Sequence, residues 1–340
     1  MARLRKQLVV AAVALFGLCS SVLAQGTLQT IKSRGHIRCG ASQGVAGFSL
    51  QDAQGNWVGF DVDVCRALAA AIFNDPSKAQ FLPLSSKDRI TALQSGEVDV
   101  LSRTMTWTLA RDSAQGLIFT AVNYYDGQGF KVRKSLKVGS LKELQGASIC
   151  VAQGTTNELN VADYFRANNM KYEVVTFADI DDVVQAYQNG RCDALSTDVS
   201  QLASYRLKMT NPDEHVVLPE VISKEPIGPW VRQGDVQWFH IVRWTLFAML
   251  NAEELGVTQA NVDEMLTSPN PEVRRLLGLE GSLGAGLGLT NDWAVRIVRH
   301  VGNYGESFDR NLGAKSRIGL PRGLNNLWGK GGIQFAPPVR

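Results

Sequence analysis

The sequence predicts an α/β protein built from two units of the same plan, and three observations lead to this prediction. Short apolar runs typical of buried strands alternate with segments whose apolar residues recur at helical spacing. This alternation is interrupted by a glycine-containing extended stretch at 124–132 and then starts again. A second stretch, 223–234, contains two prolines and two glycines that keep it out of a helix. We therefore expect largely parallel sheets in two units, with the chain crossing between them twice.

The first unit opens with a strand at 36–40, followed by a loop of small residues. The segment 52–56 (DAQGN) suits a hairpin turn, because Gly and Asn favour the backbone conformations of tight turns. Asp61 can cap a helix over 62–73, whose apolar residues repeat at helical spacing. The later elements expected here are a strand at 81–84, a helix at 87–95, a strand at 98–101 and an extended segment at 118–119.

The second unit repeats this alternation from residue 141 onward. Its expected strands are 147–151, 173–177, 194–198 and 216–218, and its expected helices are 141–144, 153–167, 180–188 and 200–207. After the second crossing, Asp235 caps a long helix that runs to residue 252, and a short helix follows at 269–277. The remaining segment, 281–340, is glycine-rich, and we expect it to be irregular and to be held against the protein by its aromatic residues, which are Trp293, Tyr304, Phe308, Trp328 and Phe335.

The first 24 residues have the pattern of a secretory signal peptide. A basic start is followed by an apolar run at 8–18 that is too short to span a bilayer. Small residues then offer a cleavage site after Ala24. Cys19 invites a lipoprotein interpretation, but Leu18 stands before it where lipid attachment normally requires a small residue. We therefore expect a soluble exported protein whose segment 1–24 is removed.

Charge and composition exclude several classes of function. The full chain has a formal charge of +3, and residues 1–24 carry three basic residues and no acids, so the expected mature chain has no net charge. A nucleic-acid partner is therefore not expected. The apolar segment 241–250 is too short to span a membrane and contains Arg243, so it is expected to be a buried helix. No P-loop, GxSxG or HExxH pattern occurs, and neither a cofactor nor a metal is expected.

Four cysteines remain after residue 24: Cys39, Cys65, Cys150 and Cys192. An even number in an exported protein suggests disulfides, and four cysteines allow three pairings. The local pairings, Cys39–Cys65 and Cys150–Cys192, would each tie one unit internally, whereas a bridge between the units would oppose relative motion. No CxxC spacing occurs, and the four histidines do not cluster near the cysteines, so a zinc site is not expected.

The segment 99–112 (DVLSRTMTWTLARD) has the composition of a carboxylate-binding site. Hydroxyl side chains, among them Thr104 and Thr106, follow the end of an expected strand, and Arg111 stands on the first turn of a helix. A guanidinium offers two parallel donors that match the two oxygens of a carboxylate, and hydroxyls and loop amides fill the remaining lone pairs. The alternative is a threonine-rich loop with a solvated arginine, which is the common case when such a segment stands alone.

Four segments in this order resemble one family, the polar-amino-acid substrate-binding proteins of bacterial ABC transporters. They are 56–63 (NWVGFDVD), 99–111 (DVLSRTMTWTLAR), 152–156 (AQGTT) and 190–194 (GRCDA) with Asp198. The cysteines and the long C-terminal segment resemble the general L-amino-acid-binding subgroup. The resemblance implies a type II periplasmic binding fold with two Rossmann-like lobes, 25–128 with 229–340 and 129–228, joined by two hinge crossings, with the ligand in the cleft between them.

The resemblance also assigns ligand-binding residues. Arg111 corresponds to the family's carboxylate-binding arginine, and Thr104 and Thr106 to its ligands in the first lobe. Thr156 corresponds to the carboxylate donor of the second lobe, which suits the start of a helix, where free N–H groups favour an anion. Asp198 corresponds to the acid that binds the ligand's ammonium group, although an N-cap for the helix that follows is an alternative role that it could also combine with binding.

The expected function is that of a periplasmic, monomeric binding protein that delivers free L-amino acids to an ABC permease. Members selective for basic amino acids carry an aromatic residue and an acid in the first loop, where this chain has Val45 and Ser42, so a broad range is expected. Three alternatives remain. They are a narrower binder of glutamate, glutamine, aspartate and asparagine, an exported dehydratase on the same scaffold, and a sensory ligand-binding domain.

Overall fold

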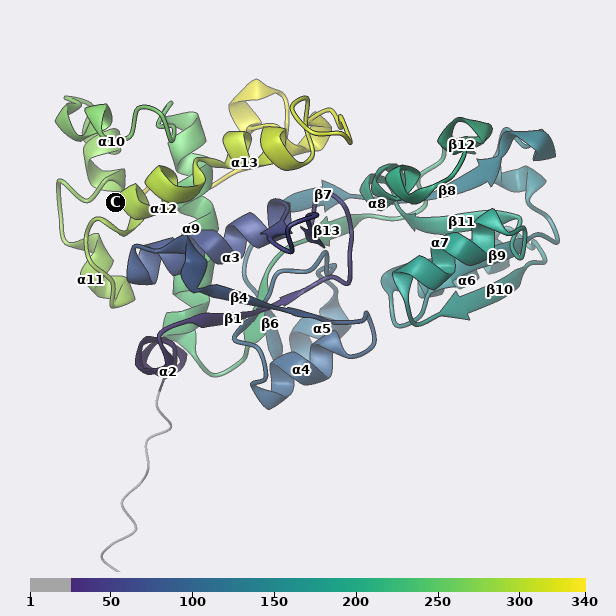
Figure 1. Cartoon of the computed structure of the whole chain (residues 1–340), viewed down its shortest axis with the longest axis horizontal. Coiled ribbons are helices and arrows are strands. Elements are labelled where there is room, and N and C mark those ends of the chain that lie inside the picture. The colour runs from purple at the N-terminus through teal and green to yellow at the C-terminus, as the bar shows by residue number, and fades with distance from the viewer. Residues whose placement is uncertain (1–25) are drawn as a thin grey trace, which may run out of the picture.

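The computed structural model describes residues 26–340, and the predicted signal peptide therefore lies outside the described residues. Two five-stranded sheets form two lobes that lie beside each other (Figure 1). The sheet of the larger lobe has the order β4-β1-β5-β14-β6. Its strands are β1 (Ile37–Ala41), β4 (Ala79–Pro83), β5 (Val100–Leu101), β6 (Leu117–Phe119) and β14 (Trp230–Arg232). Strand β1 pairs in parallel with β4 and β5, and β14 is antiparallel to both of its neighbours.

The sheet of the smaller lobe has the order β10-β9-β11-β8-β12. Its strands are β8 (Gln128–Arg133), β9 (Ser148–Ala152), β10 (Glu173–Phe177), β11 (Ala194–Asp198) and β12 (His215–Val217). Strands β9, β10 and β11 are parallel, β8 is antiparallel to its neighbour β11, and β12 is antiparallel to β8. The α/β prediction is therefore confirmed, and each sheet has three parallel strands on one side and antiparallel pairing on the other.

Helices connect and cover these strands. In the larger lobe they are α2 (Thr27–Arg34), α3 (Phe60–Phe73), α4 (Arg89–Ser95), α5 (Leu109–Ala114), α9 (Val236–Glu254), α10 (Pro271–Leu276), α11 (Leu283–Leu287), α12 (Trp293–Val301) and α13 (Tyr304–Asn311). In the smaller lobe they are α6 (Thr156–Ala167), α7 (Ile180–Gln188) and α8 (Val199–Tyr205). A short antiparallel hairpin of β2 (Leu50–Gln51) and β3 (Trp57–Val58) flanks the predicted turn at 52–56.

The chain crosses between the lobes through two paired strands. Strand β7 (Tyr124–Asp126) leads into β8, and β13 (Glu225–Ile227) leads back to β14. The two strands pair antiparallel and form a separate two-stranded sheet between the lobes (Figure 1). A narrow two-stranded connection of this kind concentrates any relative motion of the lobes in a few residues.

Two disulfides form, and each stays within one lobe. Cys39 on β1 is bonded to Cys65 on α3, and Cys150 on β9 is bonded to Cys192 just before β11. These are the two local pairings among the three that the sequence allows. Neither bridge joins the two lobes, so the disulfides leave the lobes free to move relative to each other.

Two sequence-based predictions were wrong. Asp61 does not cap a helix, because α3 already begins at Phe60, and the carboxylate of Asp61 is instead buried and bound by a distant loop. The segment 281–340 is also not irregular throughout. Its apolar residues at 293–301 recur at helical spacing and form α12, and the next helix, α13, begins with a capping box formed by Asn303 and Glu306.

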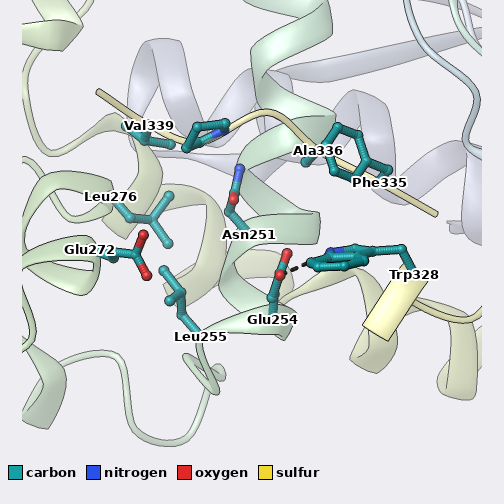
Figure 2. A pocket seen from close by; sticks show the side chains of 10 residues that line it. Asn251, Glu254, Leu255, Glu272, Leu276, Trp328, Phe335, Ala336 and Val339 are labelled. Atoms are coloured by element: carbon teal, nitrogen blue, oxygen red, sulfur yellow. Dashed lines mark hydrogen bonds between the residues drawn. The ribbon is translucent and has the colours of Figure 1, made fainter. Parts of the chain in front are cut away.

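The C-terminal segment is attached to the larger lobe over its whole length. Trp293, Tyr304 and Phe308 are buried as expected, whereas Trp328 and Phe335 remain more than half exposed. Residues 328–339 run across α9 and line a surface pocket between α9 and α10, in which the Trp328 indole donates a hydrogen bond to Glu254 (Figure 2). None of the residues that line this pocket belongs to the smaller lobe.

The same segment also binds the first crossing strand. The side chain of Asn325 accepts a hydrogen bond from the backbone N of Tyr125 (2.6 Å) and donates one to its carbonyl (3.1 Å). One residue before β7, the carbonyl of Asn123 accepts hydrogen bonds from the Tyr304 hydroxyl (2.7 Å) and the Gln334 amide (3.1 Å). The C-terminal segment thereby anchors one end of the hinge to the larger lobe.

We predict that Asn325→Ala lowers the free energy of unfolding by about 2–3 kcal/mol, because it removes two hydrogen bonds and leaves a partly buried backbone N–H without a partner. Urea unfolding followed by circular dichroism measures the change. Asn326→Ala is the matched control, since the Asn326 amide binds only the neighbouring C-terminal turn. Equal losses in the two variants would contradict an anchoring role for Asn325.

Candidate functional site

A narrow cavity lies between the lobes, and both of them line it. The larger lobe contributes Ser86, Arg89, Arg103, Thr104 and Thr106, and the smaller lobe contributes Ala152, Thr155, Thr156, Asn157, Ile180, Thr197, Asp198, Gln201 and Tyr205. The free space within it is about 20 Å³, close to that of a single water molecule. The lobes are therefore in a closed arrangement, and a larger molecule could enter only if they moved apart.

Two predicted ligand residues, one from each lobe, touch across this cavity. The hydroxyl oxygens of Thr106 and Thr156 are 3.3 Å apart. The hydroxyl of Thr156 donates a hydrogen bond to Glu225 on the crossing strand β13 (2.9 Å). Because Thr156 has only one hydroxyl proton, Thr106 is the donor in the pair of threonines. Farther along the interface, the side-chain amide of Gln43 donates to Asp179 of the smaller lobe (3.3 Å). Few direct contacts hold the lobes together at this point.

Thr156 is the first residue of α6 and lies at a helix N-terminus, as the sequence predicted, although the helix begins later than residue 153. The N-cap is Thr155, whose hydroxyl accepts a hydrogen bond from the backbone N of Glu158 (3.3 Å). The unpaired N–H groups of this first turn lie beside the cavity, where they favour a negatively charged ligand group.

Arg111 is buried at the edge of the cavity, although it is not among the residues that line it. It lies on α5, whose N-cap is Thr108, and its Nη1 donates to the carbonyl of Thr106 (2.9 Å). Burial lowers the pKa of Arg111, and the negative charges of Glu225 and Asp198 partly offset this. The guanidinium thus lies directly behind Thr106 and within the field of the acids across the cavity.

Asp198 is the last residue of β11, and its carboxylate is almost completely buried. It occupies the N-cap position of α8, but its side chain makes no capping hydrogen bond. Instead, the amides of Asn157 (2.8 Å) and Gln201 (3.2 Å) each donate to one of its oxygens. Burial and the nearby carboxylates of Asp126 and Glu225 raise the pKa of Asp198 well above its usual value. A cation in the cavity would stabilise the ionised form of Asp198.

Thr104 has a positive φ of 40°, which is unusual for a residue with a side chain. Its backbone N donates to the buried carboxylate of Asp61 (2.9 Å), which also accepts a hydrogen bond from the Asn123 amide (3.1 Å). Asp61 therefore ties the threonine loop of the cavity to the start of the hinge. Burial raises the pKa of Asp61 to about 6, and these two hydrogen bonds oppose the rise.

We predict that Asp61→Asn removes a pH-dependent contribution to the free energy of unfolding. The pKa of Asp61 is about 6 in the folded protein, above its ordinary value of 3.8, so the folded state holds the proton more tightly. This stabilisation is complete below pH 3.8 and is lost as the pH rises through 6. We therefore compare the free energies of unfolding of wild type and variant by urea unfolding at pH 7 and at pH 4. The value for wild type minus that for the variant should be about 2–3 kcal/mol larger at pH 4. A constant difference would contradict the assignment.

Sequence reasoning missed three charged residues of this region. Arg89 begins α4 and Arg103 follows β5, and both guanidinium groups are buried and line the cavity. Glu225 lies on β13 and accepts hydrogen bonds from Thr156, Ser223 and Asn160. Burial is not readable from a single arginine or glutamate in a sequence, and no pattern around these three indicated it.

The first-loop residues do not line the cavity. Ser42 is buried, and its hydroxyl lies 2.7 Å from that of Ser49, while Val45 is buried in the core. Within residues 26–340 there is no group of three or more His, Cys, Asp or Glu side chains placed to hold a metal ion. In the same range, none of the helices has the length and apolar character needed to cross a membrane.

The two-lobed fold and the hydroxyl- and arginine-lined cleft define a class of protein. Residues 37–260 match the model of the bacterial extracellular solute-binding proteins, family 3, and the chain belongs to this family. The family is one of extracellular solute-binding proteins. The last 80 residues, which anchor the hinge, lie beyond the matched region.

Relatives of full length share this C-terminal segment. The chain is 57% identical to the general L-amino acid-binding periplasmic protein AapJ of Rhizobium johnstonii, over 96% of each chain. It is 52% identical to the glutamate/glutamine/aspartate/asparagine-binding protein BztA of Rhodobacter capsulatus, over 99% of this chain and 100% of the relative. A solved periplasmic binding protein of Brucella ovis, with glutathione bound, is 55% identical and superimposes with a TM-score of 0.91 over 93% of this chain and 100% of that one.

Proposed function

We propose that this protein is the periplasmic binding component of an ABC importer and that it closes on free L-amino acids of a broad range. The contact between Thr106 of one lobe and Thr156 of the other, with Arg111 and Asp198 beside it, is the observation that supports this most directly. A ligand held between these groups bridges the lobes and stabilises the closed arrangement. The lobes that close are 25–128 with 229–340 and 129–228.

The charges of the site fit the part that all amino acids share. Arg111 and the N–H groups at the start of α6 would hold the α-carboxylate, with Thr104 and Thr106 as further donors. Asp198 would accept hydrogen bonds from the α-ammonium group. Both charges of the ligand would then face groups of opposite sign, which is the condition for burying them at low cost.

The relatives support transport rather than catalysis. AapJ is named as a general L-amino acid-binding protein, and BztA as a binding protein for glutamate, glutamine, aspartate and asparagine. A closed, amino-acid-loaded form would dock on a membrane permease, and the protein would act as a monomer without catalytic activity. The narrower range of BztA is the second candidate, and the buried arginines of the cavity favour it.

A thermal-shift screen against the twenty amino acids tests this function, because a ligand that binds only the folded state raises the melting temperature. Glutathione should be included, since the Brucella ovis relative binds it. A rise with many chemically different amino acids supports the broad range. A rise only with the acidic amino acids and their amides supports the second candidate. If no amino acid raises the melting temperature, the proposed function is wrong.

A further inference from the structure

The surface pocket between α9, α10 and the C-terminal segment takes no part in the proposed function. We refer to it as the C-terminal pocket. Its volume of about 360 Å³ lies in the range of pockets that hold small molecules. The residues that line it come from α9 with its C-terminal end, from α10 and from the stretch 328–339, and none of them also lines the cleft. The pocket is therefore a separate candidate site.

Two neighbouring aromatic side chains form part of its wall and stay exposed. Trp328 is 57% exposed and Phe335 is 59% exposed, and their ring centroids lie 6.2 Å apart with the planes at 73°. The indole N–H of Trp328 donates a hydrogen bond to Glu254 (3.0 Å), which fixes the orientation of the ring (Figure 2). Apolar side chains that are exposed together indicate a binding surface, whereas single exposed ones are common.

The same pocket is acidic. The carboxylates of Glu254 on α9 and Glu272 on α10 both line it (Figure 2). In the part of the chain that the structure describes, no Lys, Arg or His side chain is among the lining residues. The faces of aromatic rings also carry partial negative charge. The carboxylates and the rings therefore favour the same kind of guest, which is a cation with an apolar body.

The last residue of the chain already places a cation at the edge of the pocket. Arg340 does not line the pocket, but its guanidinium lies 3.6 Å from the carboxylate of Glu272. The Arg340 side chain is 69% exposed and that of Glu272 is 50% exposed. An ion pair so open to water contributes little to stability. A cation in the pocket could therefore replace Arg340 as the partner of Glu272 at low cost.

We propose that the C-terminal pocket binds a free small organic ammonium ion, with Trp328 and Phe335 against its alkyl groups and Glu254 and Glu272 facing its charge. An alkylammonium ion such as choline combines the positive charge and the apolar surface that this pocket selects. A hydrated metal ion has no apolar groups to place against the rings, and a neutral apolar molecule gains nothing from the carboxylates. The site lies outside the cleft, so the proposal is independent of the proposed function.

Fluorine NMR of the protein labelled with fluorotryptophan tests the proposal. The chain has seven tryptophans, and the resonance that is absent from Trp328→Phe identifies Trp328. Choline chloride at millimolar concentration should shift this resonance, whereas sodium chloride at equal ionic strength should not. The neutral analogue 3,3-dimethylbutanol has the shape of choline without its charge and should shift the resonance at least about fivefold less. Equal shifts with choline and its analogue, or no shift with choline, would show that the proposal is wrong.

Two variants test the carboxylates. Glu254→Gln and Glu272→Gln should each weaken choline binding about threefold, measured by titration of the Trp328 resonance. Glu280→Gln is the matched control, because the Glu280 side chain is 51% exposed, lies 3.7 Å from that of Arg274 and does not line the pocket. It should bind choline like wild type. An equal loss of affinity in Glu280→Gln and Glu272→Gln would contradict a specific site.

Arg340→Ala provides a test in the opposite direction. It removes the cation that competes for Glu272, so it should raise the affinity for choline about twofold. A lower affinity in this variant would contradict the proposal. Sedimentation with phosphatidylcholine vesicles distinguishes the free ion from a lipid headgroup. Protein that stays in the supernatant supports the free ion, and co-sedimentation that Glu272→Gln abolishes would assign the pocket to a lipid headgroup instead.

Discussion

Arg111→Ala is expected to weaken the binding of every amino acid by at least about 100-fold. The proposed carboxylate contact is charge-assisted and two-pronged, and each such hydrogen bond contributes about 1.5–3 kcal/mol. The contact involves the part that all L-amino acids share, so the loss should be similar for small, large, neutral and acidic ligands. Titration calorimetry with alanine, leucine and glutamine measures it, because these ligands differ only in their side chains.

Two further variants separate binding from folding. Arg111→Lys keeps one positive charge but loses the two-pronged geometry, so we expect an intermediate loss of affinity. Arg166→Ala removes an arginine on α6 whose side chain is 79% exposed, and it should bind like wild type. Since Arg111 also donates to the carbonyl of Thr106, the melting temperature of each variant must be recorded. Near-wild-type affinity in a folded Arg111→Ala protein would contradict the assignment of the site.

The features that the sequence predicted well depend on neighbours in the chain. Residues close together in the sequence determine three such features. They are the alternation of strands and helices, the hairpin at 52–56 and the start of α6. The position of Asp198 belongs to the same group, because the predicted strand 194–198 ends with this acid. Local patterns of this kind carry their information in the spacing of apolar and capping residues.

The features that it missed depend on contacts between distant residues. Asp61 binds Thr104 and Asn123, which are 43 and 62 residues away, and a capping role looked equally suitable for an acid before a helix. Asn325 binds Tyr125 across 200 residues, so nothing near either residue indicates the contact. The third example is Arg89, whose burial at the cavity depends on residues from both lobes that are distant in the sequence. None of these three roles leaves a periodic signal.

The closed arrangement of the lobes is also a property of the whole fold. Thr106 and Thr156 meet only because two crossing strands, β7 and β13, hold separate lobes at a short distance. The family resemblance supplied these residues as ligands, while their composition alone was equally consistent with an ordinary loop and an ordinary helix cap. Family membership therefore contributed more to the prediction of the site than the local sequence did.

Asp198→Asn is expected to weaken the binding of neutral amino acids by about 100-fold at pH 7, because the ligand's ammonium group loses its negatively charged partner. The folded protein should not lose stability by the same change. The carboxylate is buried near those of Asp126 and Glu225, and replacing it with an amide removes a like-charge repulsion. This gain offsets the loss of one of the two hydrogen bonds that its oxygens accept from Asn157 and Gln201. A large loss of affinity with an unchanged or higher melting temperature is therefore the expected combination. Asp182→Asn, on the exposed face of α7, is the control and should change neither quantity.

The pH dependence of binding provides an independent test of the same residue. The pKa of Asp198 in the free protein is raised, and an ammonium ligand prefers the ionised form, so binding releases protons and weakens as the pH falls from 7 to 5. Asp198→Asn should make this fall shallower, with the remainder due to Asp126, whose pKa burial raises to about 6. Glutamine is the suitable ligand, since its side chain does not titrate in this range. An equally steep fall in the variant would show that Asp198 does not bind the ammonium group.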